Sequence, residues 1–414
     1  VGISLLTEIP GIIDGLFGIG LNKPVTGIYE ETIQAINSSK HLVFAIDIPS
    51  GLSADTAKPM NIAIKADYTI TFGYNKVGLI LYPGCEYAGK VIVADIGFPK
   101  AAFEATKSVA DRKYFLYNES DKDKLPTRYE YSNKGTYGRV LIIAGSNNMS
   151  GACYLSAKAA YRTGAGLVKV MTVEENRIIM QQLLPEALLY TYSSKTFEDL
   201  DKIEELISQI HWASAIVIGP GIGISKDSEK LLDVVIKNAK VPLLIDADGL
   251  NILAAMNQRL IDHEQDILLH EEILRMLPKE TILTPHVKEL SRLIHIPVEQ
   301  IVDHLYEVSN NCTNNNELIF VIKDPRTIIT YKDMTYINTS GNNGMATGGS
   351  GDVLTGVIGA FLATGLSPWE ASKLGVYIHG LAGDKAAEKK GCYGMLASDI
   401  IEALPEVLEN GKKR

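Results

Sequence analysis

A glycine-rich stretch, Asn342–Gly356, runs directly into an apolar helix and is the strongest chemical signal in the sequence. Glycines let the backbone approach a ligand closely, and the first N–H groups of the next helix face an anion with the positive end of the helix dipole behind them. The stretch therefore predicts a phosphate-binding loop. Asp352, on the first helical turn, could take a proton from a hydroxyl that attacks a phosphoryl group. The alternative is that Asp352 only caps the helix, but Gly-Gly-Ser-Gly-Asp before a long small-residue helix favours catalysis.

Three further groups of residues follow predicted strands, at the edge where a parallel sheet opens to ligands. The glycines of 219–223 form a flexible turn, which either admits a ligand or simply connects a strand to a helix. Asp246 and Asp248 could steer a metal-bound nucleotide or cap the next helix. His286, after Thr-Pro, offers an imidazole to a polar substrate, although a solitary histidine often has a structural role.

The elements that must position these residues alternate along the chain. Short β-branched runs are separated by longer amphipathic segments, a pattern that predicts βαβ units and a mainly parallel sheet. The predicted strands are 42–47, 68–72, 90–95, 139–144, 167–172, 214–218, 242–246, 281–283 and 318–322. The strand periodicity is lost in 101–135, which gathers charge, and we place a domain boundary near residue 125. The first block is small for a domain that must cover both faces of its sheet.

Composition excludes several classes of protein. A chain of 414 residues is too long for one ordinary domain, so two domains are expected. With 40 basic against 49 acidic residues, the net charge of −9 gives no general attraction to nucleic acid or to an anionic membrane. Four widely spaced cysteines do not form a disulfide framework, and no apolar stretch approaches the roughly 20 residues of a membrane span. We expect a cytoplasmic protein.

The order of the motifs resembles the ribokinase-like domain of NAD(P)HX dehydratases. The resemblance rests on VLIIAGSNNMSGACYLSAKAAYRTGAGLV (140–168), IVIGPGIG (216–223), LLIDADGLN (243–251), TPHVKEL (284–290), GMATGGSGDVLTG (344–356), HGLAGD (379–384) and Asp399. In this family, nucleotide hydrolysis drives the removal of water from the C6 hydrate of NADH or NADPH, which restores the coenzyme. The resemblance therefore implies this dehydration.

Residue roles follow from the same resemblance. It implies that Asp352 is the general base and that Gly351 contacts the nucleotide phosphate. The hydrated coenzyme would contact Ala152, Gly221, His286 and Asp352, and the nucleotide loop would comprise Lys323, Asp324, Pro325, Arg326 and Thr327. Two positions depart from the family: Val287-Lys288 replace its usual Pro-Gly, and Asp324 replaces a glycine. A side chain and a negative charge at Asp324 would lie beside phosphates.

The first block resembles the C-terminal half of the NAD(P)HX epimerase domain of bacterial bifunctional enzymes, on 13–24, 43–52, 65–79 and 93–97. The resemblance implies that Asp14 and Ser50 bind potassium and that Asp47 binds the substrate and could transfer a proton. Its other substrate-binding residues would be Gly18, Ile19, Gly20, Leu21, Asn22, Lys23 and Pro24. Strand-end caps and turns explain these residues equally well. The family's GNNGGDG loop does not occur in this block, and the GNNG at 341–344 belongs to the dehydratase loop, so we expect a truncated and incomplete epimerase half.

The sequence thus predicts an α/β protein: a partial Rossmann-like domain at 1–100, a linker at 101–127 and a ribokinase-like, doubly wound domain at 128–414. The expected cofactors are ADP or ATP, Mg²⁺ and K⁺, the expected substrate is NADHX or NADPHX, and the family tends to form homo-oligomers. Two alternatives stay open. One is a ribokinase-like kinase of a hydroxymethylpyrimidine, a thiazole or a sugar, and the other is a nucleotide-binding module without turnover.

Overall fold

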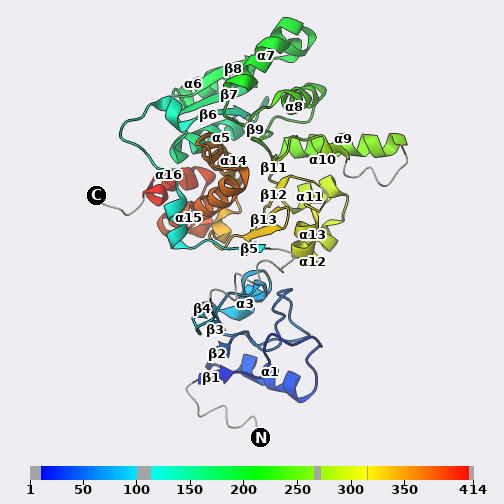
Figure 1. The fold of residues 1–414 in the computed structure, drawn as a ribbon, viewed down its shortest axis with the longest axis vertical. Helices are drawn as coiled ribbons and strands as arrows, with labels where there is room; N and C mark the ends of the chain where they lie inside the picture. The colour runs from blue at the N-terminus through cyan, green and yellow to red at the C-terminus, as the bar shows by residue number, and fades with distance from the viewer. Residues whose placement is uncertain (1–10, 100–112, 265–271, 315, 410–414) are drawn as a thin grey trace. The chain divides into compact units, whose positions relative to one another are not determined.

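The computed structural model describes residues 11–99, 113–264, 272–314 and 316–409 (Figure 1). The chain divides into two compact units between Asp111 and Arg112. No helix in the described ranges is both long enough and apolar enough to cross a membrane.

The first unit is a four-stranded parallel sheet in the order β1-β2-β3-β4. Its strands are β1 (Gly11–Asp14), β2 (Leu42–Ile46), β3 (Tyr68–Phe72) and β4 (Lys90–Ala94). Its helices are α1 (Ile28–Ser38), α2 (Val77–Ile80) and α3 (Gly84–Ala88). Ile33 and Ile36 of α1 pack against Val43 and neighbouring apolar residues on one face. Ile13, Ile46 and Ile92 are exposed on the other face, as the strand register shows.

The second unit is built on a ten-stranded sheet in the order β5-β14-β13-β12-β11-β10-β9-β6-β7-β8. The strands are β5 (Lys113–Phe115), β6 (Arg139–Ile143), β7 (Leu167–Val173), β8 (Leu188–Tyr192), β9 (Ala215–Ile218), β10 (Leu243–Ile245), β11 (Ile282–Leu283), β12 (Ile319–Ile322), β13 (Ile328–Tyr331) and β14 (Met334–Ile337). β13 is antiparallel to both of its neighbours, and every other pair is parallel. The central strands are buried on both faces, which is why they appear in the sequence as continuous apolar runs.

Helices cover both faces of this sheet (Figure 1). One face packs against α5 (Ser150–Thr163), α6 (Arg177–Leu183), α14 (Ser350–Ala363), α15 (Pro368–Gly394) and α16 (Ala397–Leu408). The other packs against α7 (Leu200–Trp212), α8 (Lys226–Asn238), α9 (Asp248–Glu264), α10 (Glu272–Arg275), α11 (Val287–Ile294) and α12 (Val298–Asp303), with α13 (Leu305–Asn311) beside them. This arrangement confirms the predicted doubly wound class.

The segment that we assigned to a linker contains the first strand of the large sheet. β5 pairs in parallel with β14, and the Tyr117 ring packs edge-on against the rings of Tyr336 and Tyr377, with centroids 5.1 and 5.7 Å apart. Residues 113–127 are thus packed onto the second unit, whereas the predicted linker residues 101–112 lie outside the described ranges. A three-residue edge strand is too short to show a periodic pattern, so composition placed the boundary too late.

Candidate active site

The carboxyl ends of five neighbouring parallel strands, β6 and β9 to β12, meet at one edge of the large sheet. The strand order reverses at β6, because β7 and β8 continue on one side and β9 to β12 on the other. Ligands of open α/β sheets bind outside such an edge. Every residue predicted for the dehydratase site follows one of these strands or lies at the start of α14. The fold therefore gathers segments that are up to 200 residues apart in the chain.

The glycine-rich loop ends where α14 begins. Gly349 precedes the helix with a φ of 90°, a left-handed conformation that favours glycine. A Cβ on Gly351 would lie 3.5 Å from Lys323 Nζ and 3.7 Å from Asp246 Oδ2, so the Gly351 backbone faces a cation and a carboxylate. Close packing fixes α14 itself, because a Cβ on Gly356 would lie 2.1 Å from the Ser156 carbonyl oxygen of α5.

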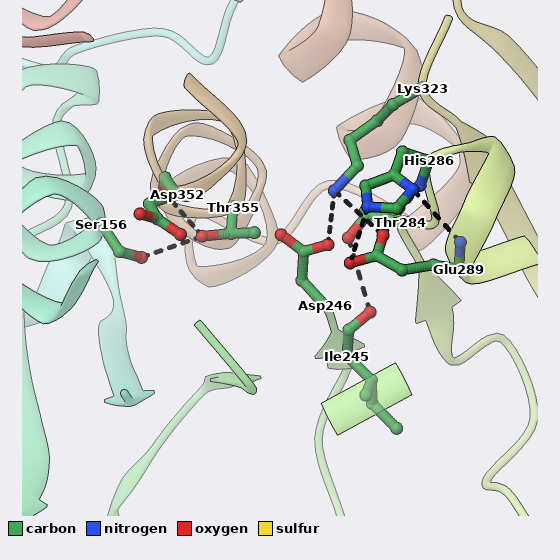
Figure 2. Close-up of polar contacts among 9 residues, drawn as sticks. All are labelled: Ser156, Ile245, Asp246, Thr284, His286, Glu289, Lys323, Asp352 and Thr355. Atoms are coloured by element: carbon green, nitrogen blue, oxygen red, sulfur yellow. Dashed lines mark hydrogen bonds and ion pairs between the residues drawn. The ribbon is translucent and has the colours of Figure 1, made fainter. Parts of the chain in front are cut away.

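Asp352 has the electrostatics of a base that works near neutral pH. Burial, together with the nearby Asp246 and Asp248 carboxylates, raises its pKa to about 7, and Lys323 opposes the shift. The N-cap residue of α14 is Gly349, so the helix has no side-chain cap at that position. The Asp352 backbone carbonyl accepts a 2.7 Å hydrogen bond from the Thr355 hydroxyl, which lies 3.0 Å from the Ser156 hydroxyl (Figure 2).

Lys323 joins the nucleotide loop to the rest of the cluster. Its Nζ donates a 2.7 Å hydrogen bond to Asp246 Oδ1 and lies 3.8 Å from Glu289 Oε2. Burial by itself would lower the pKa of Lys323, but the Asp246, Glu289 and Asp352 carboxylates outweigh it and raise that pKa. Figure 2 shows Asp246 between the first turn of α14 and the Lys323 ammonium group. Lys323 is therefore a fully charged group beside the phosphate-binding loop.

His286 caps α11 from the end of β11. The imidazole Nδ1 accepts a 3.1 Å hydrogen bond from the Glu289 backbone N–H. In return, the His286 backbone N–H donates a 2.9 Å hydrogen bond to Glu289 Oε2. The His286 backbone forms a parallel bridge with Lys323, so the two residues lie side by side. The His286 side chain is 48% exposed and remains accessible to a ligand.

Ala152 and Gly221 meet at the point where the strand order reverses. A Cβ on Gly221, whose φ is 63°, would lie 2.9 Å from the Ala152 Cβ, so glycine alone fits there without displacing α5. The Gly145 N–H donates a 2.8 Å hydrogen bond to the Pro220 carbonyl, and the Gly223 N–H donates one of 2.8 Å to Asp248 Oδ2. The structure thus forms two groups along one edge: Ala152 with Gly221, and Gly351 and Asp352 with His286 and Lys323.

The other residues of the nucleotide loop lie along the turn from β12 to β13. Asp324 does not have a positive φ, so the backbone accommodates a side chain where the family has glycine. Burial raises the pKa of Asp324 to about 6, so this carboxyl is still mostly ionised at pH 7 and keeps a negative charge in the loop. Arg326 donates a 2.7 Å hydrogen bond to the Thr339 carbonyl, and the Thr327 hydroxyl donates one of 3.4 Å to the Asp324 carbonyl. Of the five loop residues, Lys323 has the direct contacts with Asp246 and Glu289.

Two residues at these sites were not singled out from the sequence. Glu289 is 6% exposed and contacts both His286 and Lys323. It lies in the TPHVKEL motif three residues after His286, and that spacing by itself usually indicates a helix cap. Lys76 contacts Asp47 in the first unit, 29 residues along the chain, and no local pattern relates the two.

In the first unit, Asp14 and Ser50 are joined directly. Asp14 is 2% exposed, its Oδ2 accepts a 2.7 Å bond from the Ser50 N–H, and its Oδ1 accepts one of 2.6 Å from the Ser50 hydroxyl. A carboxylate and a hydroxyl are suitable oxygen donors for K⁺, so the pair fits part of a potassium site. Over the described ranges, no group of three or more His, Cys, Asp or Glu residues forms a metal cage.

Asp47 follows β2 and has a φ of 66°, unusual for a residue with a side chain. Its Oδ1 accepts hydrogen bonds from the Phe72 N–H at 2.9 Å, from the Thr71 hydroxyl at 3.2 Å and from the Lys76 ammonium group. Burial would raise the pKa of Asp47, but Lys76 and the other donors together lower it. The predicted substrate segment 18–24 follows β1 and is mostly exposed.

The fold and the site define an α/β protein of the ribokinase-like class. A structure of a ribokinase-like superfamily protein from Enterococcus faecalis matches with a TM-score of 0.59 and 28% identity, covering 72% of this chain and 95% of that one. A Bacillus subtilis ADP/ATP-dependent NAD(P)H-hydrate dehydratase, co-crystallised with ATP and Mg²⁺, matches with a TM-score of 0.58 and 27% identity, covering 70% and 96%.

The sequence comparisons identify the family within this class. The family model described as NAD(P)H-hydrate dehydratase matches residues 140–406, and one described as YjeF-related protein N-terminus matches residues 4–78. The bifunctional NAD(P)H-hydrate repair enzyme of Thermofilum pendens is 34% identical over 403 residues, which cover 96% of this chain and 72% of that protein. The chain belongs to the NAD(P)H-hydrate dehydratase family, as the motifs predicted, and this favours the dehydratase over the kinase alternative.

Proposed function

We propose that the second unit dehydrates the C6 hydrate of NADH or NADPH at the expense of ADP or ATP, with Asp352 as the general base. The observation that carries the proposal is the position of Asp352 on the first turn of α14, beside Lys323 and Gly351, with a pKa raised to about 7. A general base works best when its pKa lies near the working pH.

The proposed reaction has two steps. Asp352 takes the proton of the C6 hydroxyl while that oxygen attacks the terminal phosphoryl group, so an O–P bond forms and the nucleotide leaves as AMP or ADP. The C6–O bond then breaks, phosphate departs with the electron pair, and loss of a C5 proton restores the dihydronicotinamide ring. The Gly351 backbone and the Lys323 ammonium group would stabilise the phosphoryl oxygens.

Magnesium fits this site as the companion of the nucleotide. Asp246 pairs with Lys323 and Asp248 accepts a hydrogen bond from Gly223, so neither carboxylate is free of a protein partner. Mg²⁺ is commonly held by nucleotide phosphates with few protein ligands, where it neutralises developing charge. Lys323, Asp324, Pro325, Arg326 and Thr327 would lie along the nucleotide, with Lys323 closest to its phosphates.

The hydrated coenzyme would lie along the same edge of the sheet. Because His286 Nδ1 accepts a backbone hydrogen bond, the neutral imidazole carries its proton on Nε2, which can donate to a polar group of the substrate. Ala152 and Gly221 are small residues in contact, and their backbones can approach the coenzyme closely.

For the first unit we propose a part of the epimerase site, with Asp47 and residues 18–24 on the substrate and with K⁺ near Asp14 and Ser50. Asp47 accepts hydrogen bonds from Thr71, Phe72 and Lys76, which would fix its orientation toward the ring. We further propose that the protein is cytoplasmic, forms homo-oligomers and does not bind nucleic acid, in keeping with its net charge of −9.

The test of the dehydratase is the recovery of NADH absorbance from purified S hydrate, with ADP and separately with ATP. Recovery that requires nucleotide supports the proposal, and absence of recovery with both nucleotides contradicts it. A mixture of both hydrate epimers then tests the first unit: a slow second phase that accelerates with protein concentration, and only in K⁺, indicates epimerisation.

A further inference from the structure

Glu289 lies between the two residues that we assign to different ligands. Its Oε1 is 3.4 Å from His286 Nε2, and its Oε2 is 3.8 Å from Lys323 Nζ (Figure 2). The same Oε2 accepts the 2.9 Å hydrogen bond from the His286 N–H. One buried carboxylate thus contacts His286, which we assign to the coenzyme, and Lys323, which we assign to the nucleotide.

A capping role accounts for only some of these contacts. The cap requires a hydrogen-bond acceptor for the His286 N–H, and a neutral glutamine would provide one. It does not require a charge, a position beside a lysine or nearly complete burial, and a buried carboxylate is costly unless it is paired. The contacts with Lys323 and with the imidazole ring are therefore the part that capping leaves unexplained.

The backbone holds His286 and Lys323 side by side, so that the Glu289 side chain can contact both residues. The Lys323 N–H donates a 2.8 Å hydrogen bond to the Pro285 carbonyl, and the two strand ends form a bridge at His286 and Lys323. Lys323 Nζ in turn lies 2.7 Å from Asp246 Oδ1. Asp246 also reaches the first turn of α14, because a Cβ on Gly351 would lie 3.7 Å from Asp246 Oδ2.

We infer that Glu289 is a positioning residue that couples the coenzyme site to the nucleotide site by holding His286 and Lys323 in a fixed relation. The inference rests on the proposed function, which puts the coenzyme at His286 and the nucleotide at Lys323. A ligand that orders either residue also orders the other through Glu289, so each substrate strengthens the binding of the other.

Glu289→Gln separates this role from capping. In the place of Oε2, the amide oxygen can still accept the His286 N–H, but it no longer carries a charge that pairs with Lys323. The amide NH₂ takes the place of Oε1 and faces the imidazole Nε2–H, with which it cannot form a hydrogen bond. The coupling therefore weakens while the helix cap survives. The variant also removes a negative charge near Lys323, so the positive charge of this lysine is less offset. The pKa of Asp352 should then be lower, and the acid limb of kcat/KM should move to lower pH.

Asp121→Asn is the matched control. In a 3₁₀ helix at Glu119–Lys124, Asp121 accepts a 2.8 Å hydrogen bond from the Asn118 N–H and pairs with Lys124 at 2.8 Å. It thus has the same combination of cap and lysine contact, outside the candidate site. This variant should retain the wild-type kinetic constants and pH profile.

The experiment measures the KM of ADP at low and at saturating S hydrate, with the full chain. The wild-type ratio of the two values should be about fivefold or more, and the ratio in Glu289→Gln should fall toward unity, with the acid limb displaced to lower pH. Equal ratios in the two proteins, or an unchanged pH profile, would overturn the inference. A wild-type protein without turnover would instead overturn the proposed function, so the two failures are distinguishable.

Discussion

Asp352→Asn removes the proposed base while keeping the size of the side chain. General-base catalysis contributes about 10²–10⁴-fold to rates, so turnover with ADP and S hydrate should fall by about that factor. In the wild-type protein the base must be ionised, and its pKa is raised to about 7. The rate should therefore fall about tenfold for each pH unit below 7, whereas the residual rate of the variant should lack this acid limb.

The same substitution should increase stability, and this separates lost chemistry from lost folding. The folded pKa of Asp352 is raised from 3.8 to about 7, so the folded state holds its proton more tightly than the unfolded state. Stability is therefore greatest at low pH and declines as the pH rises from about 4 to about 7. The decline is at most about 4 kcal/mol at 1.36 kcal/mol per pKa unit.

An asparagine does not ionise and so avoids this loss. Thermal unfolding at pH 8 should show a Tm for Asp352→Asn that is equal to or above that of the wild type, and the difference should shrink at pH 4. Near-normal turnover in the variant would refute the assignment of the base. Loss of turnover together with a lowered Tm at pH 8 would refute the electrostatic argument.

Three further substitutions test other contacts. Gly351→Val places a branched side chain next to Lys323 Nζ. Calorimetry should show ADP binding weakened about tenfold or more, with the affinity for the coenzyme unchanged. An unchanged ADP affinity would show that the phosphate does not bind at Gly351. Gly356→Ala puts a Cβ against the Ser156 carbonyl and should cost on the order of 1–3 kcal/mol in urea unfolding, whereas Gly394→Ala, at an open position, should cost less than that. Lys76→Met removes the cation that lowers the pKa of Asp47 below 3.8, so hydrogen exchange in β2 should accelerate at pH 7 and progressively less as the pH falls below 3.8, where Asp47 loses its charge in the folded protein. The exposed Lys90→Met should not accelerate exchange at either pH, and equal acceleration by Lys76→Met at pH 7 and well below pH 3.8 would contradict this prediction.

The sequence predicted the fold well where local patterns are strong. The apolar runs at 139–144 and 214–218 match β6 and β9, because strands buried on both faces must be continuously apolar. The edge strand β5 was missed, since its three residues gain their pairing only from β14, some 220 residues later. β8, β13 and β14 were also absent from the predicted strands, although β8 pairs with the nearby β7 and β13 pairs with β14.

The same distinction applies to the candidate sites. Asp352 and Gly351 lie in a motif whose spacing alone indicates phosphate chemistry, and the structure places Lys323 beside them. Glu289 and Lys76 have partners that are distant in sequence, so their roles depend on the folded arrangement of strand ends. The roles of the site residues remain predictions that the substitutions test.

The most direct measurement of the central claim follows NADH and phosphate together, as purified S hydrate is converted by the full chain with ADP. Dehydration through a phosphorylated C6 oxygen predicts that NADH and inorganic phosphate appear in equal amounts, and that Asp352→Asn slows the release of both by the same factor. Consumption of nucleotide with a stable phosphorylated product and no NADH would instead indicate a kinase, and would contradict the account.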